Sequence, residues 1–377
     1  DMKSKLCYFV NSAWYFELHW LDRACAALHA GYEVYVIARF DDDDLMRRLN
    51  EKGLICFDSK IKETSLNPVF FLLDCHRAFN ILDSISPDIL HSITIKPGII
   101  SGLWSNLRNK KLIYSFVGLG RVFDSKNILF KFLRYFIIML YRKLFSRVDC
   151  KIVFEHKEDQ RKIIELLGIS EDATVVIDGA GIDTRFFSYS DEFNHPKVKV
   201  LFASRLLWSK GLADLVKAKR ILKLKGIDFE LFVAGIPVTG DKDAIDIKNI
   251  DEWQRSGDII WLGQRSDIRD LIRISNIVAL PSTYPEGVPR ILLESGAIGR
   301  PCLVYNIGGC KSLIKDEFNG YAVEPGNIEL LSSRLEKLIL DSEERHRMGK
   351  NARQNIECKY RSEIIINETL RVYGDTK

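Results

Sequence analysis

The chain has 377 residues, of which 46% are hydrophobic and 28% are charged, and its formal net charge is +4. This balance excludes a disordered or fibrous protein, and the length suits two globular domains of ordinary size. The small net charge, without a long basic tract, excludes nucleic acid as an expected partner. The eight cysteines are scattered without zinc-site spacing, so we expect reduced thiols of a cytoplasmic protein.

Short apolar runs alternate with helical patterns from the start of the chain. A first strand is expected at residues 6–10, and after a helical pattern that stops at Gly31 the next is expected at residues 33–38. Further strands are expected at residues 54–57, 88–91, 111–115 and 151–154. Strands that alternate with helices form parallel sheets with helices on both faces, so this half predicts an α/β domain.

A polar stretch that contains a proline, residues 191–196, precedes a second alternation of the same kind. Its strands are expected at residues 198–203, 229–233, 259–262, 277–280 and 302–305. The chain therefore predicts two Rossmann-like domains, residues 1–190 and residues 191–359, that face each other across a cleft. Ligands of such sheets bind beyond the carboxyl ends of the strands, so the loops there are the places to look for chemistry.

Residues 281–296, with the sequence PSTYPEGVPRILLESG, follow one of these strands and open a helix. Pro289 suits the first helical turn, and the peptide groups of Gly287 and Val288 can point at an anion at the helix N-terminus. This arrangement predicts a diphosphate site. A capped helix with two solvated glutamates is the alternative, because short motifs have many false positives.

Charged side chains in two strand-end loops extend this prediction. Glu286 and Glu294 can accept paired hydrogen bonds from vicinal hydroxyls, as recognition of a sugar or a ribose requires. Arg205 and Lys210 lie in another loop between a strand and a helix, where two cations would offset charge on a departing diphosphate. Taken alone, such a pair is typical of a solvated basic loop, which is the alternative interpretation. Its position at a strand end, together with the Glu286 loop, favours a common site.

The spacing of Arg205 and Lys210, the spacing of Glu286 and Glu294, and the Gly308-Gly309 loop resemble glycosyltransferase family 4. That family is retaining and has the GT-B fold of two facing Rossmann-like domains. The resemblance implies that the arginine and lysine hold the donor diphosphate, the first glutamate contacts the transferred sugar, and the second binds the ribose. The expected catalytic residues are Arg205, Lys210 and Glu286, and the expected donor-binding residues are these three with Gly287, Val288, Pro289 and Glu294.

No metal ion and no cofactor are expected, because members of the family work without a bound metal and the nucleotide sugar is a substrate. Four consecutive aspartates, residues 41–44, could be mistaken for a metal site. They precede a helical pattern that starts at Leu45, so a helix N-cap with acidic side chains in the first turn is the better interpretation.

The first half resembles one branch of the family, the capsule and O-antigen transferases that extend lipid-linked sugars. The resemblance lies in residues 91–98, 118–123 and 178–187, although Val117 stands where many members have histidine, which excludes a histidine role there. It implies transfer of a hexose or N-acetylhexosamine from a nucleotide diphosphate, with UDP favoured, to a polyprenyl-diphosphate-linked glycan. The candidate acceptor contacts are His19, His91, Lys96, Gly118 and Arg121. For the two histidines, a satisfied core position is the alternative.

Residues 126–147 carry six cations, no acid and many large apolar side chains, with an apolar centre too short to span a bilayer. This pattern predicts a helix at the membrane interface beside anionic lipids. The candidate membrane contacts are Lys131, Arg134, Phe136, Arg142 and Lys143. A core-packed helix with a basic exposed face is the alternative. Without a signal peptide or an apolar run of spanning length, we expect a cytoplasmic protein at the inner face of the cell membrane.

The combined interpretation is a retaining hexosyltransferase that binds its donor in the second domain and its acceptor in the first. The resemblance also implies that residues 360–377 form a helix that crosses back to the first domain. Two alternatives remain: a sugar-nucleotide epimerase or phosphorylase on the same fold, and a non-catalytic membrane scaffold that binds a nucleotide sugar. The first would need no acceptor glycolipid, or would need phosphate. The second would not release the nucleotide.

Overall fold

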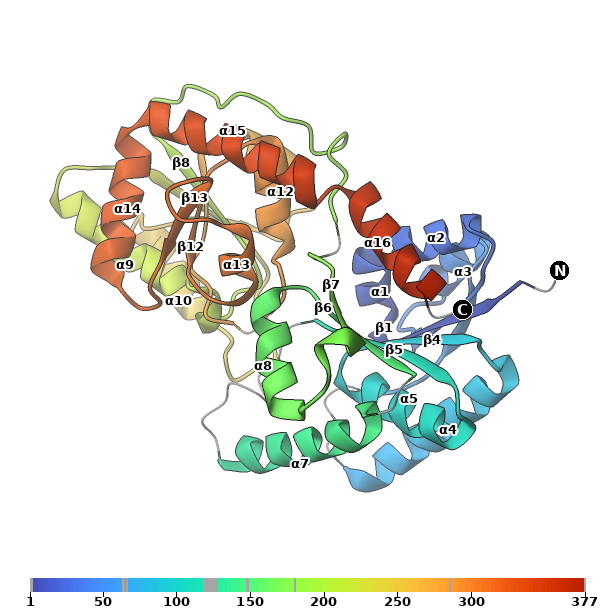
Figure 1. Cartoon of the computed structure of the whole chain (residues 1–377). Coiled ribbons are helices and arrows are strands. Elements are labelled where there is room, and N and C mark those ends of the chain that lie inside the picture. The colour runs from blue at the N-terminus through green and yellow to red at the C-terminus, as the bar shows by residue number, and fades with distance from the viewer. Residues whose placement is uncertain are drawn as a thin grey trace. The chain divides into compact units, whose positions relative to one another are not determined.

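The computed structural model describes residues 3–62, 65, 67–117, 128–146, 149–179, 181–284 and 286–375. It divides into two compact units (Figure 1). Unit 1 comprises Asp1–Ala180 and Ser362–Lys377, and unit 2 comprises Gly181–Arg361. Among the described helices, none is both long enough and apolar enough to cross a membrane. All eight cysteines are free thiols, as their scattered positions predict.

Unit 1 contains a parallel sheet with the strand order β3-β2-β1-β4-β5-β6-β7. Its strands are β1 (Lys5–Ser12), β2 (Glu33–Arg39), β3 (Ile55–Asp58), β4 (Ile89–Ile93), β5 (Lys111–Phe116), β6 (Cys150–Phe154) and β7 (Thr174–Val176). Its helices are α1 (Ala13–His19), α2 (Leu21–His29), α3 (Asp43–Glu51), α4 (Pro68–Ile85), α5 (Ile95–Arg108), α7 (Ile128–Phe145), α8 (Lys157–Leu167) and α16 (Ser362–Asp375), with the 3-10 turn η1 (Glu171–Ala173).

The helices of unit 1 form two layers, because each face of the sheet buries its own apolar core. On one face, side chains of α4, α5, α7 and α8 pack together against the strands. On the other face, side chains of α1, α2, α3 and α16 do so, and α16 lies on α2 (Figure 1). Helix α16 and strand β1 therefore contribute side chains to the same core.

Unit 2 contains a second parallel sheet, with the strand order β10-β9-β8-β11-β12-β13. Its strands are β8 (Lys199–Ala203), β9 (Glu230–Ala234), β10 (Ile260–Gly263), β11 (Ile277–Leu280), β12 (Cys302–Tyr305) and β13 (Gly320–Val323). Its helices are η2 (Trp208–Lys210), α9 (Leu212–Leu224), α10 (Ile247–Arg255), α11 (Ile268–Ile274), α12 (Arg290–Ile298), α13 (Gly308–Leu313), α14 (Ile328–Leu340) and α15 (Ser342–Lys359). The central strands are buried on both faces, which is why β11 reads as an unbroken apolar run.

Residues 181–190 belong to unit 2, so the polar stretch at residues 191–196 lies inside that unit. Phe187 packs into the core of unit 2. Two arginines of the same unit hold the backbone here: Arg353 donates to the carbonyl of Phe187 at 2.8 Å, and Arg300 donates to the carbonyl of Ser190 at 2.6 Å. These contacts tie a segment without regular secondary structure to the second core.

The aspartates of residues 41–44 confirm the helix-cap prediction. Asp42 is the N-cap of α3 and its side chain accepts a hydrogen bond from the Asp44 backbone N–H at 2.8 Å. The Asp44 carboxylate in turn pairs with Arg47 and Arg48 on the next turn. The carboxylates therefore complete the start of a helix, where the helix dipole favours negative charge.

Candidate functional site

The predicted donor residues of unit 2 lie in loops at the centre of its sheet. The strand order reverses between β8 and β11: β9 and β10 follow on one side, and β12 and β13 follow on the other. Loops at the carboxyl ends of two such strands diverge and leave room for a ligand. Arg205 and Lys210 follow β8, and Glu286 follows β11, so the structure brings both motifs to this reversal point.

Backbone contacts fix these loops against one another. The carbonyl of Ser209 accepts a hydrogen bond from the Thr283 N–H at 2.7 Å, which joins the loop after β8 to the loop after β11. Gly211 has φ +92°, and a Cβ there would lie 2.0 Å from the carbonyl oxygen of Pro281. Only glycine permits this approach, so the lysine-glycine pair in the sequence serves the contact between the loops.

The loop after β12 also lies against the loop after β11. A Cβ on Gly309 would lie 2.0 Å from the carbonyl oxygen of Gly287 and 2.5 Å from the backbone nitrogen of Val288. The backbone of the Gly308-Gly309 loop therefore supports the peptide groups that precede α12. This contact gives a physical reason for the second glycine of that loop.

Lys210 and Glu286 form the centre of the site. Lys210 is only 5% exposed, and its Nζ lies 2.5 Å from Oε1 of Glu286. The Ser282 hydroxyl lies 3.4 Å from the same carboxylate oxygen. The Tyr284 ring faces the cations, with its centroid 4.6 Å from Nζ of Lys210 and 5.5 Å from Cζ of Arg205. Two positive charges thus lie near one aromatic ring, and the nearer of them is paired with a carboxylate.

Helix α12 begins four residues after Glu286. Pro289 is the N-cap residue, one position before the first helical turn that the sequence predicts, and its carbonyl accepts from the Leu292 N–H at 3.1 Å. Its φ of −65° is the value that the pyrrolidine ring imposes. Gly287 is buried and Val288 is half-buried just before it. Both predicted backbone donors therefore belong to the segment that enters the helix.

Glu294 lies about one turn inside α12 and is almost completely buried. Burial raises the pKa of its carboxyl to about 7, against the opposing effect of Arg290. The Arg290 Nε lies 3.0 Å from Oε1 of Glu294, as a spacing of four residues on a helix allows. The spacing of four residues is visible in the sequence, but Arg290 is not among the donor-binding residues that the sequence predicts.

Ser282 and Tyr284 were also missed as parts of the site, although both lie in the PSTYPEG segment. Nothing in their spacing distinguishes them from ordinary loop residues. Their role depends on the neighbouring loop, because the ring contacts of Tyr284 are made with Arg205 and Lys210.

In unit 1, His91 is a buried residue with both ring nitrogens engaged. Its Nδ1 lies 2.7 Å from the Tyr373 hydroxyl, and its Nε2 lies 2.7 Å from the Ser115 hydroxyl. Burial lowers the pKa of this imidazole to about 3, so the ring is neutral. The structure favours the core alternative for His91 over an acceptor contact.

The other acceptor candidates are more accessible or lie outside the described residues. His19 ends α1 half-buried, with its ring 4.5 Å from that of Tyr15. Lys96 lies in the first turn of α5 and donates to the Lys62 carbonyl at 2.6 Å. Gly118 and Arg121 lie outside the described residues, as do the ends of residues 126–147.

The helix α7 has one face in the core of unit 1, as the core-packed alternative predicts, and one exposed face, whose contact with a membrane stays a prediction. One face, which includes Tyr141 and Phe145, packs in the core of unit 1. Lys131, Phe136 and Lys143 are exposed, and Arg134 is half-buried. Arg142 is exposed, but its guanidinium donates to the Leu166 carbonyl at 2.9 and 2.6 Å and so helps to end α8. The core contact accounts for one face of this helix, and the side chains of Phe132, Phe136 and Met139 on the other are more than half exposed.

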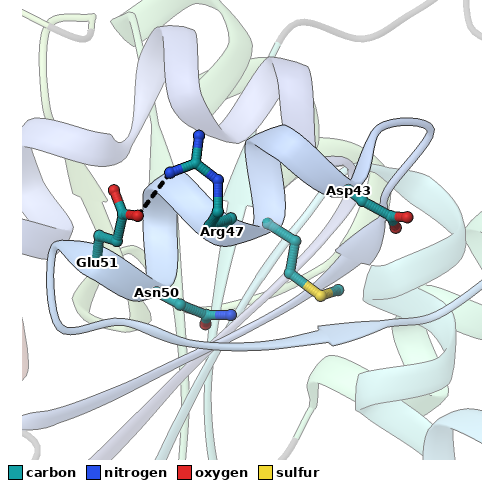
Figure 2. A pocket seen from close by; sticks show the side chains of 5 residues that line it. Asp43, Arg47, Asn50 and Glu51 are labelled. Carbon is teal, nitrogen blue, oxygen red and sulfur yellow. Dashed lines mark hydrogen bonds and ion pairs between the residues drawn. The ribbon is translucent and has the colours of Figure 1, made fainter.

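A surface hollow along α3 is a poorer candidate for the functional site than the loops of unit 2. Figure 2 shows Arg47 and Glu51 pointing toward each other, and their ion pair measures 2.6 Å. Arg47 also pairs with Asp44. The hollow is lined by side chains of this one helix: Asp43, Met46, Arg47, Asn50 and Glu51. Among the residues that the structure describes, no cluster of histidine, cysteine or acidic side chains has the makings of a metal site.

Comparison with known families covers most of the chain. Residues 183–355 match the model of glycosyl transferases group 1, and residues 5–154 match the model of the glycosyl transferase 4-like family. Together they include the strands of both sheets except β7, and the loops at the reversal point of unit 2. The chain is a glycosyltransferase with a 4-like first domain and a group 1 second domain. The family prediction made from the Arg205 and Glu286 motifs is confirmed.

Two curated relatives match this glycosyltransferase along most of their length. One, from Campylobacter jejuni, is 28% identical over 359 residues, which is 90% of each chain. It is named as an N,N'-diacetylbacillosaminyl-diphospho-undecaprenol alpha-1,3-N-acetylgalactosaminyltransferase. Another, from Escherichia coli, is 26% identical over 74% of this chain and 73% of its own, and is named as a UDP-Gal:alpha-D-GlcNAc-diphosphoundecaprenol alpha-1,3-galactosyltransferase.

Solved structures share the fold of this glycosyltransferase over its whole length. A glycosyltransferase from Rickettsia africae has a TM-score of 0.79 at 21% identity, with 100% of this chain and 99% of that chain covered. HepE from Anabaena, solved in complex with UDP, has a TM-score of 0.77 at 18% identity, with 99% and 100% covered. The predicted GT-B class, with two parallel-sheet α/β domains, is confirmed.

Proposed function

We propose that this glycosyltransferase moves a hexose or N-acetylhexosamine from UDP to a polyprenyl-diphosphate-linked glycan, with retention at the anomeric carbon, in surface polysaccharide synthesis. The names of the Campylobacter and Escherichia relatives support a lipid-linked acceptor. The Anabaena structure in complex with UDP and the UDP-Gal in the Escherichia relative's name support the nucleotide.

The observation that carries the proposal is the cluster of Arg205, Lys210 and Glu286 at the reversal point of the unit 2 sheet. The ion pair between Lys210 and Glu286 places a nearly buried cation beside the peptide groups that lead into α12. We assign the UDP diphosphate to this position, where Lys210 and Arg205 offset the charge that accumulates as the sugar departs. The charge of Lys210 acts strongly there, because the nearly buried side chain is little screened by water, whereas Arg205 is exposed.

The two glutamates take different parts of the donor in this proposal. Glu286 is half-buried and already accepts hydrogen bonds from Lys210 and Ser282, so hydroxyls of the transferred sugar would join an existing network. Glu294 binds the ribose. Its pKa of about 7 means that the free site holds a mixture of protonated and ionised carboxyl near neutral pH. Two ribose hydroxyls that donate to it would favour the ionised form.

The acceptor is assigned to unit 1, with His19 and Lys96 as candidate contacts. Helix α7 carries exposed apolar and basic side chains, such as Phe136, Lys131 and Lys143. A lipid-linked acceptor would bring this surface to a membrane. We therefore place the protein at the inner face of the cell membrane, as a peripheral protein of the cytoplasm.

The reaction we propose is a front-face displacement without metal. The leaving diphosphate takes the proton of the acceptor hydroxyl as the new bond forms on the same face of the sugar. Lys210 and Arg205 stabilise the diphosphate, and Glu286 orients the sugar. Chelation of divalent cations by EDTA should leave the rate unchanged, and a rate that falls with EDTA and returns with magnesium would refute this part.

The test is acceptor-dependent release of free UDP, measured with UDP- and GDP-sugars and a membrane extract as acceptor. Wild type should release UDP with at least one donor, and Glu286→Ala should lose this activity. Glu329→Ala is the matched control, because Glu329 is an exposed glutamate in the first turn of α14 and belongs to none of the three loops. It should leave UDP release unchanged.

The same assay separates the alternatives. Release only in the presence of inorganic phosphate would indicate a phosphorylase, and isomerised donor without any acceptor would indicate an epimerase. Donor binding without any release would favour the non-catalytic scaffold. The anomeric configuration of the product, read by proton NMR, tests retention, since an inverted linkage refutes it.

A further inference from the structure

The start of α4 carries an unusual exposed apolar segment. Residues 68–73 have no charged side chain, and Phe71 packs against the core and fixes the segment to unit 1. The exposed fractions of its neighbours are 64% for Val69, 55% for Phe70, 68% for Leu72 and 52% for Leu73. Single exposed apolar residues are ordinary, but a contiguous group of large ones marks an interaction surface.

The exposed face of α7 has a different composition. Leu129, Phe132, Phe136 and Met139, each more than half exposed, repeat at helical spacing along it. Unlike the start of α4, this helix also carries basic residues, with no acidic residue anywhere in it. It therefore presents apolar side chains and positive charge together.

Both exposed faces belong to the same layer of unit 1. Side chains of α4 and α7, among them Leu82 and Tyr141, contribute to one core, and α5 contacts both helices. Figure 1 shows α4 and α7 on the same side of the unit 1 sheet, flanking α5. The outer faces of the two helices consequently point away from the sheet on one side.

We propose that α4 and α7 form one membrane-docking surface with divided roles: the start of α4 inserts into the bilayer, and α7 binds anionic headgroups. This inference rests on the proposed membrane location and extends it to α4. Insertion of uncharged side chains depends on the hydrophobic effect and is insensitive to salt. Attraction between lysines and anionic lipids is screened within about 10 Å at ordinary ionic strength, so it weakens as salt is added.

The charges favour a bilayer over a second copy of the chain. A two-fold dimer through this surface would place the same patch on both sides of the interface. Lys131 and Lys143 of one copy would then meet the lysines of the other, without an acidic residue of α7 to compensate them. A bilayer that contains anionic lipid offers both an apolar interior and negative headgroups.

The first experiment measures co-sedimentation of the whole chain with phosphatidylcholine vesicles and with vesicles that also contain phosphatidylglycerol, at low and high salt. The double variant Phe70→Ser, Leu73→Ser should bind both vesicle types about a hundredfold more weakly at either salt, since burial of each side chain contributes roughly tenfold or more. The double variant Lys131→Gln, Lys143→Gln should weaken binding only to the anionic vesicles, and chiefly at low salt.

A matched control replaces apolar residues of similar exposure in unit 2. Leu224 in α9 is 91% exposed and Leu340 in α14 is 66% exposed. Leu224→Ser with Leu340→Ser should leave vesicle binding unchanged. An α4 variant that binds both vesicle types as tightly as wild type does, while its melting temperature is also unchanged, would overturn the inserted role of α4.

A second measurement reports insertion itself. Tryptophan fluorescence of Leu72→Trp should be quenched by brominated lipids more than that of wild type, and Leu224→Trp should show no added quenching. Equal quenching in both, or a concentration-dependent dimer in lipid-free sedimentation that Phe70→Ser abolishes, would overturn the proposal. No donor or acceptor is present in these assays, so their outcome is independent of the proposed reaction. Failure of that reaction would appear in the UDP assay alone.

Discussion

The contact between Gly309 and the loop after β11 predicts that one methyl group there disrupts donor binding. A Cβ at Gly309 would lie 2.0 Å from the Gly287 oxygen and 2.5 Å from the Val288 nitrogen, both backbone atoms that cannot rotate away. Because van der Waals contacts lie near 3.5 Å, Gly309→Ala must move one loop by roughly 1 Å or more. Such overpacking costs about 1–3 kcal/mol of stability. Displacement of a positioning loop by about 1 Å can cost ~100-fold in catalysis.

The neighbouring glycine supplies the control. Gly308 has φ +51°, and a Cβ there would lie 3.5 Å from the Glu286 carbonyl oxygen, which is ordinary contact. Gly308→Ala should therefore cost about 1 kcal/mol through its backbone conformation while the loop stays in place. Calorimetric titration with UDP and the melting temperature measure the two effects separately. If Gly309→Ala binds UDP within a few-fold of Gly308→Ala, the loop contact does not position the donor site and the reasoning is refuted.

Three further substitutions test other parts of the molecule. Burial raises the pKa of Glu294 from 4.5 to about 7. The protonated carboxyl therefore contributes up to about 3 kcal/mol to the free energy of unfolding below pH 4.5, and this contribution is lost as the pH rises through 7. Glu294→Gln should remove this loss in urea unfolding between pH 5 and 8, and parallel curves for the two proteins would contradict it. Tyr373→Phe deletes the hydroxyl shared by His91 and Tyr8, and should lower the free energy of unfolding by about 1–3 kcal/mol; an unchanged thermal midpoint would contradict it. Arg345→Leu breaks a nearly buried pair with Glu192 at 3.0 Å, and should cost about 3 kcal/mol or more, with Arg345→Lys intermediate in the same thermal assay.

The alternation of strands and helices was readable in the sequence because buried parallel strands are continuous apolar runs. Two strands escaped it. β7 has three residues, which are too few to show a pattern. β13 begins at Gly320, which lacks the apolar side chain that would mark a strand. A Cβ at Gly320 would lie 2.1 Å from the carbonyl oxygen of Cys302, so glycine is required at this position. The role of residues 181–190 in unit 2 was also hidden, since it depends on distant arginines such as Arg300.

The chemistry of the donor loops was predictable where residue type alone suggests it, as for Lys210 and Glu286. The ion pair between them was not, because the two residues are 76 positions apart and meet only when β8 and β11 pair. For α7, the sequence predicted an exposed apolar and basic surface but not that Arg142 would bind the end of α8. Composition indicates what a segment can contact, and the fold selects which contacts are made.

The division of the chain has a consequence for its synthesis. Unit 2 is an insertion within unit 1, and its two ends are paired, since the Ile182 N–H donates to the Tyr360 carbonyl at 2.8 Å. A ribosome delivers all of unit 2 before α16 emerges. Until then the face of unit 1 that Tyr373 covers, including Tyr8 and His91, stays uncovered. Chaperone dependence during synthesis should therefore be concentrated in unit 1, whose core needs residues from both sides of unit 2 in the sequence.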